Sequence, residues 1–271
     1  MEMQFERNDF KKRLTSMLKV DFRRMFLSPF FYIMLGIALV VPVLILVMTT
    51  MMDGTVSVNP QTGAETVIHG FDNVWQILGS VSRTSTDSAA GMSMDLVSMC
   101  NINMMYFGVA VLVCVFVSDD FRSGYAKNLF TVRAKKTDYV ISKTVVGSVG
   151  AALMLVLFFI GAMLGGGVAS LPFEMVGFTA GNVAACMLAK LFLVILFVAV
   201  YTLASVIAKQ RLWLSILLSL GIGMLFFTMI PMITPLDSTA LHVCLSLGGG
   251  VLFSIGLGAI SNLVLKKTSL V

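Results

Sequence analysis

Six long apolar runs constrain the fold of this chain more than any other feature. A helix needs about 20 apolar residues to cross a hydrocarbon core about 30 Å thick, where every backbone polar group must be satisfied within the helix. The runs are Phe31–Met52, Leu96–Val117, Thr144–Ala169, Val183–Ile207, Leu212–Ile233 and Leu241–Leu265. Because 58% of the 271 residues are hydrophobic and only 12% are charged, a soluble domain is excluded. We predict an all-α integral membrane protein with six transmembrane helices in a single domain, residues 1–271.

The basic residues predict the orientation of these helices. All 19 Lys and Arg residues except Arg83 and Lys190 fall before the first run, between runs two and three, between runs four and five, or after run six. Since Lys and Arg favour cytoplasmic loops, both termini are predicted to be cytoplasmic, with the chain in a bacterial cytoplasmic membrane. The net charge of +5 then reflects basic residues beside the membrane, where anionic lipids of the bilayer attract them. No nucleic-acid partner is expected.

Residues 10–29 have the pattern of a basic amphipathic helix. Apolar side chains recur at intervals of three and four at Phe10, Leu14, Met17, Leu18, Phe22 and Met25. We expect this helix to lie in the inner interface and to turn into the first span at Ser28-Pro29, because proline suits a helix start. Asp21 falls close to the apolar stripe and weakens the pattern. The helix is either a simple topological anchor or part of a coupling device.

One long extracytoplasmic loop is expected at residues 53–95. The segments 55–58 and 66–68 flank a turn centred on Asn59-Pro60 and predict a short hairpin. Residues 71–81 fit one face of a helix, with Trp75 suited to the membrane interface. This loop either caps the bundle or shapes a substrate exit.

Few polar residues fall within the predicted spans. Lys190 is the only basic one, and we favour a position in which it snorkels to the outer headgroups over one facing a polar cavity. In the last span, small or polar residues recur every four positions, at Ser246, Gly250, Ser254, Gly258 and Asn262. Such a face permits close helix packing within one subunit, which we favour over the lining of a translocation pathway or a contact between subunits.

Signatures of catalysis are missing from the sequence. There is no HExxH, GxSxG or GxxxxGK[ST] motif, so neither a hydrolase nor an ATP-binding loop is expected on this chain. The four cysteines lack metal-ligand spacing, and no metal site is predicted. The chain is therefore not expected to be an enzyme, and any ATP hydrolysis would occur on a partner subunit.

The segment Ser118–Lys143 (SDDFRSGYAKNLFTVRAKKTDYVISK) is compact, polar and basic, and it lies between two apolar runs. We predict a cytoplasmic helix from Asp119 to Phe130, beginning at Asp119 and Asp120 because acidic residues favour a helix N-terminus. Phe121, Tyr125 and Leu129 recur at intervals of four, flanked by Arg122 and Lys127. A strip of this kind can insert into the groove of a partner, although a helix lying on lipid would look similar. We expect Lys143, with Arg133, Lys135 and Lys136, to be an ordinary positive anchor of the third span.

This segment resembles the membrane subunits of type-2 ATP-binding-cassette (ABC) transporters. The matching residues are Asp120, Arg122, Gly124, Lys127, Leu129 and Lys143, whereas Tyr125 and Val132-Arg133 depart from the pattern. The resemblance implies an ATP-driven exporter in which two such permeases, identical or similar, sit above two ATPase subunits that bind ATP and Mg²⁺. It also implies that Asp119–Phe130 is the coupling helix, and that the substrate is a peptide, an antibiotic or a lipid-like molecule.

Two other classes of function remain compatible with the sequence. One is a self-sufficient membrane channel or carrier, although the 14 acidic residues all fall outside the predicted spans, which does not favour a proton-coupled mechanism. The other is a membrane scaffold or sensor that transports nothing.

Overall fold

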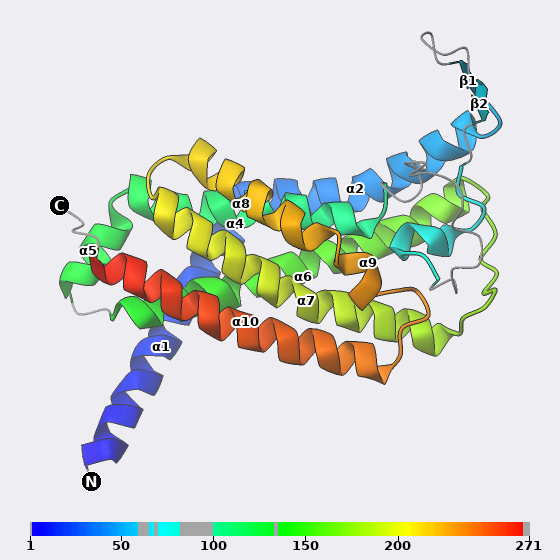
Figure 1. Ribbon diagram of the computed structural model, residues 1–271. Coiled ribbons are helices and arrows are strands. Elements are labelled where there is room, and N and C mark those ends of the chain that lie inside the picture. The colour runs from blue at the N-terminus through cyan, green and yellow to red at the C-terminus, as the bar shows by residue number, and fades with distance from the viewer. Residues whose placement is uncertain (1, 59–64, 68–69, 82–99, 133–134, 268–271) are drawn as a thin grey trace.

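The computed structural model is a bundle of long helices that lie side by side (Figure 1). It describes residues 2–58, 65–67, 70–81, 100–132 and 135–267. The helices are α1 (Glu2–Leu27), α2 (Pro29–Met52), α4 (Met105–Arg122), α5 (Tyr125–Val132), α6 (Lys136–Val168), α7 (Ala180–Ala208), α8 (Leu212–Phe227), α9 (Ile230–Ile233) and α10 (Ala240–Lys267). The smaller elements are the strands β1 (Val56–Val58) and β2 (Glu65–Val67) and the 3-10 helices η1 (Val74–Leu78) and η2 (Ile102–Met104).

Five helices in the described part of the chain are long and apolar enough to cross a membrane. They are α2, η2 continued by α4, α6, α7 and α10. This agrees with a multi-pass membrane protein made of helices, as the sequence predicted. The fifth predicted span, Leu212–Ile233, is divided between the 16-residue α8 and the single turn α9. A sixth crossing therefore stays a prediction.

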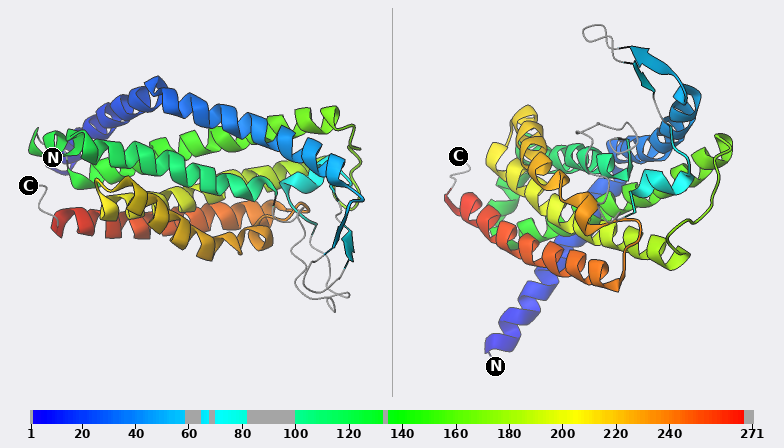
Figure 2. Two further views of the ribbon diagram at one scale, coloured as in Figure 1. Left: turned by 90° about the horizontal axis from the view of Figure 1, so that it is seen from above. Right: turned by 45° about the vertical axis from the view of Figure 1, so that its right-hand side comes forward.

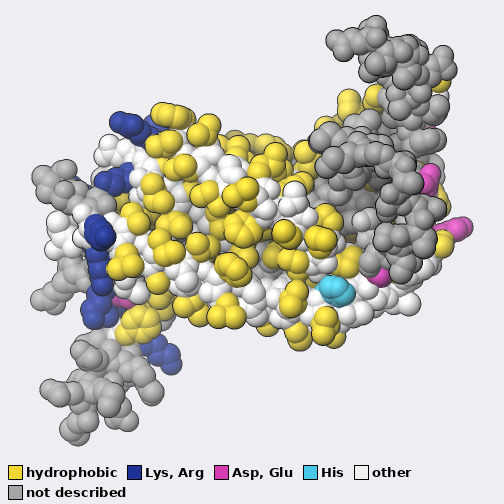
Figure 3. All heavy atoms as spheres, viewed as in Figure 1, with side chains coloured by type: hydrophobic (Ala, Val, Ile, Leu, Met, Phe, Trp, Pro, Cys, Tyr) yellow, Lys and Arg dark blue, Asp and Glu magenta, His cyan; other side chains and the backbone are white. Residues whose placement is uncertain are grey.

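The two ends of the bundle differ in charge. Lys and Arg side chains gather at one end, and the visible Asp and Glu side chains lie mostly at the other (Figure 3). We call the first the basic end and define it by Arg24, Lys127 and Lys266. Helix α1, helix α5 and the last turns of α10 all lie there, so the chain enters and leaves the bundle at the same end (Figure 1).

Helices α2 and α10 lie on opposite sides of the bundle, with α4, α6 and α7 between them (Figure 2). Glycines allow two of the closest contacts. A Cβ at Gly161 would overlap the carbonyl oxygen of Leu39, and one at Gly165 would lie 2.8 Å from the Cα of Val43, so α6 rests directly on α2. A Cβ at Gly250 would lie 2.8 Å from the carbonyl oxygen of Phe192, which brings α10 equally close to α7. Gly161, Gly165 and Gly250 therefore lie at close helix–helix contacts within this chain.

Two helices continue beyond the predicted spans near the basic end. Helix α4 runs on to Arg122, five residues beyond the predicted end of the second span, and α6 begins at Lys136 rather than Thr144. The 33 residues of α6 extend about 50 Å at 1.5 Å per residue, which exceeds a hydrocarbon core of about 30 Å. Two turns of α6 can therefore stand beyond the core, and charged residues are accommodated there.

The loop after α2 follows the sequence prediction in part. Strands β1 and β2 pair antiparallel, with Val56 opposite Val67, which confirms the hairpin. The predicted helix over 71–81 is only the 3-10 helix η1, in which the Asn73 side chain accepts a hydrogen bond from the amide of Trp75, the second residue of η1. Trp75 is buried and donates its Nε1–H to the carbonyl oxygen of Phe173 at 3.1 Å, so it anchors η1 to the segment after α6 instead of facing the membrane interface. Residues 82–95 of the predicted loop lie outside the described residues.

Candidate functional site

A buried group of charged side chains joins three helices at the basic end. Lys143 of α6 is fully buried, and its Nζ lies 2.9 Å from Asp21 Oδ1 of α1 and 2.7 Å from Asp120 Oδ2 of α4. Ser142 donates to the other Asp21 oxygen at 2.6 Å, and the Tyr139 hydroxyl donates to Asp120 at 3.0 Å. Buried charges are tolerated only when they are paired and hydrogen-bonded, and this arrangement meets both conditions.

Arg24 completes this group from α1. Its Nη1 donates to Asp120 Oδ1 at 2.6 Å, and its guanidinium stacks 4.0 Å from the centre of the Tyr125 ring. Burial has the largest single effect on the pKa of Arg24 and lowers it, but Asp120, Tyr125 and Asp21 together raise this pKa above its ordinary value, so the guanidinium stays charged. We call Asp21, Arg24, Asp120 and Lys143 the charge cluster.

A second ion pair fixes α1 farther from the cluster. Arg13 donates its Nε–H to Asp138 Oδ2 at 3.2 Å, and Asp138 is buried at the start of α6. Helix α1 is thus held to α6 by charged contacts at two levels. These contacts make α1 part of the folded bundle at this end.

The charge cluster corrects three sequence interpretations. Asp21 does not weaken the buried face of α1 but lies on it, four residues from both Met17 and Met25, which are also buried. Lys143 is not an exposed positive anchor, because α6 begins two turns earlier than predicted and carries this residue inward. Asp120 is not at a helix N-terminus, since α4 continues through it to Arg122.

The predicted helix from Asp119 to Phe130 is divided at Ser123-Gly124. Gly124 has a φ of 74°, a left-handed conformation that favours glycine and ends α4, and α5 starts afresh at Tyr125. Phe121 is buried against Tyr139 with ring centres 6.2 Å apart, so the predicted strip of Phe121, Tyr125 and Leu129 does not face outward. Leu129 is half-buried and packs on the core.

The exposed part of this segment is a different set of residues. Lys127, Asn128 and Thr131 are exposed on α5 at spacings of one and three, which places them on one face, while Ala126 is buried on the other. Arg122 and Asp119 are exposed at the end of α4. Of the residues predicted to dock a partner, Asp119, Arg122 and Lys127 are accessible, and Tyr125 is half-buried under Arg24.

Lys190 lies within the bundle, so the favoured prediction that it snorkels was wrong. A capping box formed by Thr179 and Asn182 starts α7 at Ala180, which places Lys190 about 15 Å along the helix at 1.5 Å per residue. Its side chain is fully buried and donates to Asn103 Oδ1 at 2.8 Å and to Thr234 Oγ1 at 2.9 Å. The Tyr106 hydroxyl donates to the carbonyl oxygen of Lys190 at 3.0 Å. These contacts join α4, α7 and the segment after α9.

The predicted polar face of α10 is only partly buried. Ser246 and Gly250 lie against the bundle, whereas Ser254 and Gly258 are half-buried and line a groove of about 430 Å³ between α6 and α10. Thr137 and Thr144 form part of its α6 wall, and Asn262 closes it on the α10 side. The oxygen of the Asn262 amide and the hydroxyl of Ser246 have no hydrogen-bond partner among the described residues.

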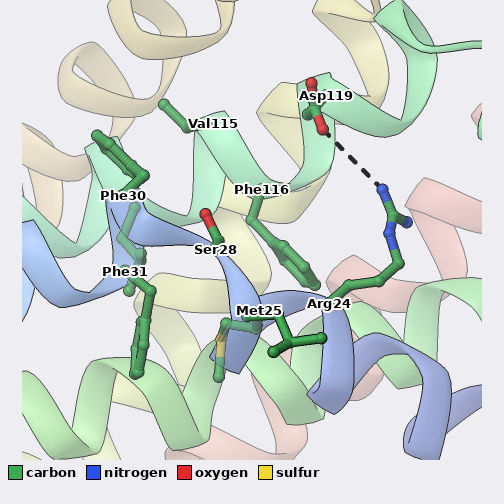
Figure 4. Close-up of a pocket in the computed structure, with 10 residues that line it drawn as sticks. Arg24, Met25, Ser28, Phe30, Phe31, Val115, Phe116 and Asp119 are labelled. Carbon is green, nitrogen blue, oxygen red and sulfur yellow. Dashed lines mark ion pairs between the residues drawn. The ribbon is translucent and has the colours of Figure 1, made fainter.

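A second groove, of about 480 Å³, opens between the α1–α2 junction and α4 (Figure 4). Its α4 wall consists of Leu112, Val115, Phe116 and Asp119, which share one helix face. Arg24 and Asp119 lie at its polar end, joined by the dashed line in Figure 4, and Nη2 of Arg24 is 4.0 Å from Asp119 Oδ2. The Lys143 Nζ lies 4.0 Å from the centre of the Phe116 ring, so this groove adjoins the charge cluster.

No family model, curated protein or solved structure matches this chain. Within the described residues, no group of three or more His, Cys, Asp or Glu could hold a metal ion. The charge cluster, the exposed face of α5 and the buried Lys190 are therefore the features on which a function must be argued.

Proposed function

We propose that this chain is the permease subunit of an ATP-driven ABC exporter. It would form the translocation pathway as a dimer, with a second copy or a similar chain, above two separate ATPase subunits that carry ATP and Mg²⁺. The basic end would face the cytoplasm, as the distribution of Lys and Arg favours. The substrate would be a peptide, an antibiotic or a lipid-like molecule.

The observation that carries the proposal is the construction of the basic end around α5. This eight-residue helix presents Lys127, Asn128 and Thr131 outward, and its other face packs on the protein. Tyr125, its first residue, contacts Arg24 of the charge cluster. A force applied to α5 by a partner would reach α1, α4 and α6 together, because the cluster joins all three.

The docking contact is expected on the exposed face of α5. We would express the chain together with the ATPase from the neighbouring reading frame, one that contains a phosphate-binding loop, and measure its recovery on the purified chain. The double variant Lys127→Glu with Asn128→Glu should reduce the recovered ATPase about tenfold or more, because like charges placed in a complementary interface cost several kcal/mol.

The matched control is Lys266→Glu with Lys267→Glu, which alters two exposed residues at the same end, on α10. It should leave ATPase recovery unchanged. Equal recovery with the α5 variant and the wild type would rule out docking through α5. No adjacent ATPase, and no ATPase recovered with the wild type, would argue against the whole proposal.

A self-sufficient channel or carrier is the second candidate function, and one observation favours it. Lys190, Asn103 and Thr234 form a polar group inside the bundle, where a substrate or ion could be bound when the helices separate. Purified chain in liposomes that moved a solute without ATP would establish this function. Transport that required the ATPase and ATP would exclude it.

A further inference from the structure

We propose that the groove between the α1–α2 junction and α4 is a binding site for one membrane phospholipid with a zwitterionic amine headgroup, such as phosphatidylethanolamine. The proposal does not depend on the transport function. It rests on the shape of the groove, its apolar walls and the charges at its polar end.

The body of the groove suits an acyl chain. Its volume of about 480 Å³ is in the range of about 300–1,000 Å³ found for small-molecule sites. Apolar side chains form both walls: Met25, Phe30 and Phe31 come from the α1–α2 junction, and Leu112, Val115 and Phe116 come from α4. Apolar surface of this kind is stabilised by contact with hydrocarbon rather than water.

The polar end offers one group for each charge of a zwitterion. Arg24 retains donors beyond the one that binds Asp120, because Nη2 is 4.0 Å from Asp119, longer than a hydrogen bond. Guanidinium groups match phosphate geometry well, so Arg24 is the expected phosphate contact. The Asp119 side chain is 64% exposed and can accept from an ammonium group.

The surrounding charges favour an amine headgroup over an anionic one. Among the ion pairs named above, two cations, Arg24 and Lys143, are shared by three carboxylates, Asp21, Asp119 and Asp120, and Asp119 makes only the long contact of 4.0 Å with Arg24. An anionic headgroup would satisfy Arg24 but would be repelled by the neighbouring Asp119 carboxylate. A headgroup that carries both signs satisfies Arg24 and Asp119 together.

The location also fits a lipid. Arg24 and Asp119 lie at the basic end, where α1 meets the first long apolar helix at Ser28-Pro29. The apolar walls continue from there along α2 and α4, two helices apolar enough to span a membrane. The groove therefore has its polar end where headgroups would lie and its apolar walls where acyl chains would lie.

Native mass spectrometry of the full-length protein provides the test. After delipidation in detergent, the chain would be titrated with phosphatidylethanolamine and, separately, with phosphatidylglycerol. We expect one molecule of phosphatidylethanolamine to be retained per chain, with an affinity about threefold to fivefold higher than that for phosphatidylglycerol, as expected for exposed ionic contacts. Equal affinity for both lipids would overturn the headgroup assignment.

Two variants and a control locate the site. Val115→Trp would fill the groove and should abolish the retained molecule, whereas Val156→Trp, at an exposed position on α6 away from the groove, should not. Asp119→Asn should remove the preference for phosphatidylethanolamine, because it removes the acceptor of the ammonium group. Equal lipid loss in both tryptophan variants, or in neither, would show that the lipid binds elsewhere on the surface and would refute the proposal.

Discussion

Replacing Lys143 with methionine should strongly destabilise the basic end. Met is apolar and of similar length, so it fills the space of the lysine stem but removes the charge. Lys143 contacts both Asp21 and Asp120, and its side chain is fully buried. The variant leaves two buried carboxylates without this cation.

The two carboxylates should respond unequally. Asp120 keeps Arg24 at 2.6 Å and the Tyr139 hydroxyl at 3.0 Å, whereas Asp21 keeps only the Ser142 hydroxyl among the contacts described above. Removing one partner of a buried ion pair costs about 3–5 kcal/mol, and most of this cost should come from Asp21. Because about 1 kcal/mol shifts the unfolding temperature by roughly 2–4 °C in a chain of 150–250 residues, we expect a loss of about 6 °C or more.

The measurement is the midpoint of thermal unfolding of the purified chain in detergent, for four proteins. Lys143→Met should lower the midpoint, and the added change Asp21→Asn should restore part of the loss, with a coupling energy of about 1–3 kcal/mol. Lys127→Met, which removes an exposed lysine from the same end, should change stability by less than about 0.5 kcal/mol. A midpoint for Lys143→Met equal to that of Lys127→Met would refute the buried cluster.

Two further predictions follow from the packing. Gly161→Ala should lower the unfolding midpoint markedly, since the new Cβ would overlap the Leu39 carbonyl oxygen. The control Gly167→Ala places its Cβ where nothing lies within 4 Å, and it should leave stability unchanged or raise it by about 0.5–1 kcal/mol. Equal effects of the two variants would contradict the close contact between α6 and α2. Lys190→Met should destabilise the folded protein by about 1–3 kcal/mol, because it leaves the buried acceptors of Asn103 and Thr234 without their donor. The control Lys267→Met, at the exposed end of α10, should have almost no effect on the unfolding midpoint. An unchanged midpoint for Lys190→Met would show that this lysine reaches solvent.

The candidate site was less predictable than the long helices, for an identifiable reason. Asp21 and Lys143 are 122 positions apart, and each alone has the appearance of an ordinary residue near a membrane. One sequence signal could have identified Asp21, because it shares a spacing of four with the buried Met17 and Met25. No local signal pairs it with Lys143, since pairing depends on how α1 lies across α6.

The segment after the second span shows the same limit. The glycine at position 124 could have been interpreted as a helix end, and that interpretation would have separated α4 from α5. The spacing of Phe121, Tyr125 and Leu129 instead favoured one continuous helix, because aromatic periodicity is a stronger pattern than a single glycine. The conformation of Gly124, with a φ of 74°, was decided by the turn that brings α5 back over Arg24.

The sequence by itself determined the class of fold. Its apolar runs are long enough to form membrane-spanning helices, in which every backbone N–H and C=O group is hydrogen-bonded within the helix. This property can be predicted from the sequence because the hydropathy of each segment does not depend on its neighbours. The tertiary structure decided which charges are buried and which are exposed. Asp120 and Lys143 form a buried ion pair, Lys190 donates to Asn103 and Thr234, and Lys127 is exposed. A charge can be buried only beside suitable partners, and only the packing of the helices brings those partners within hydrogen-bonding distance.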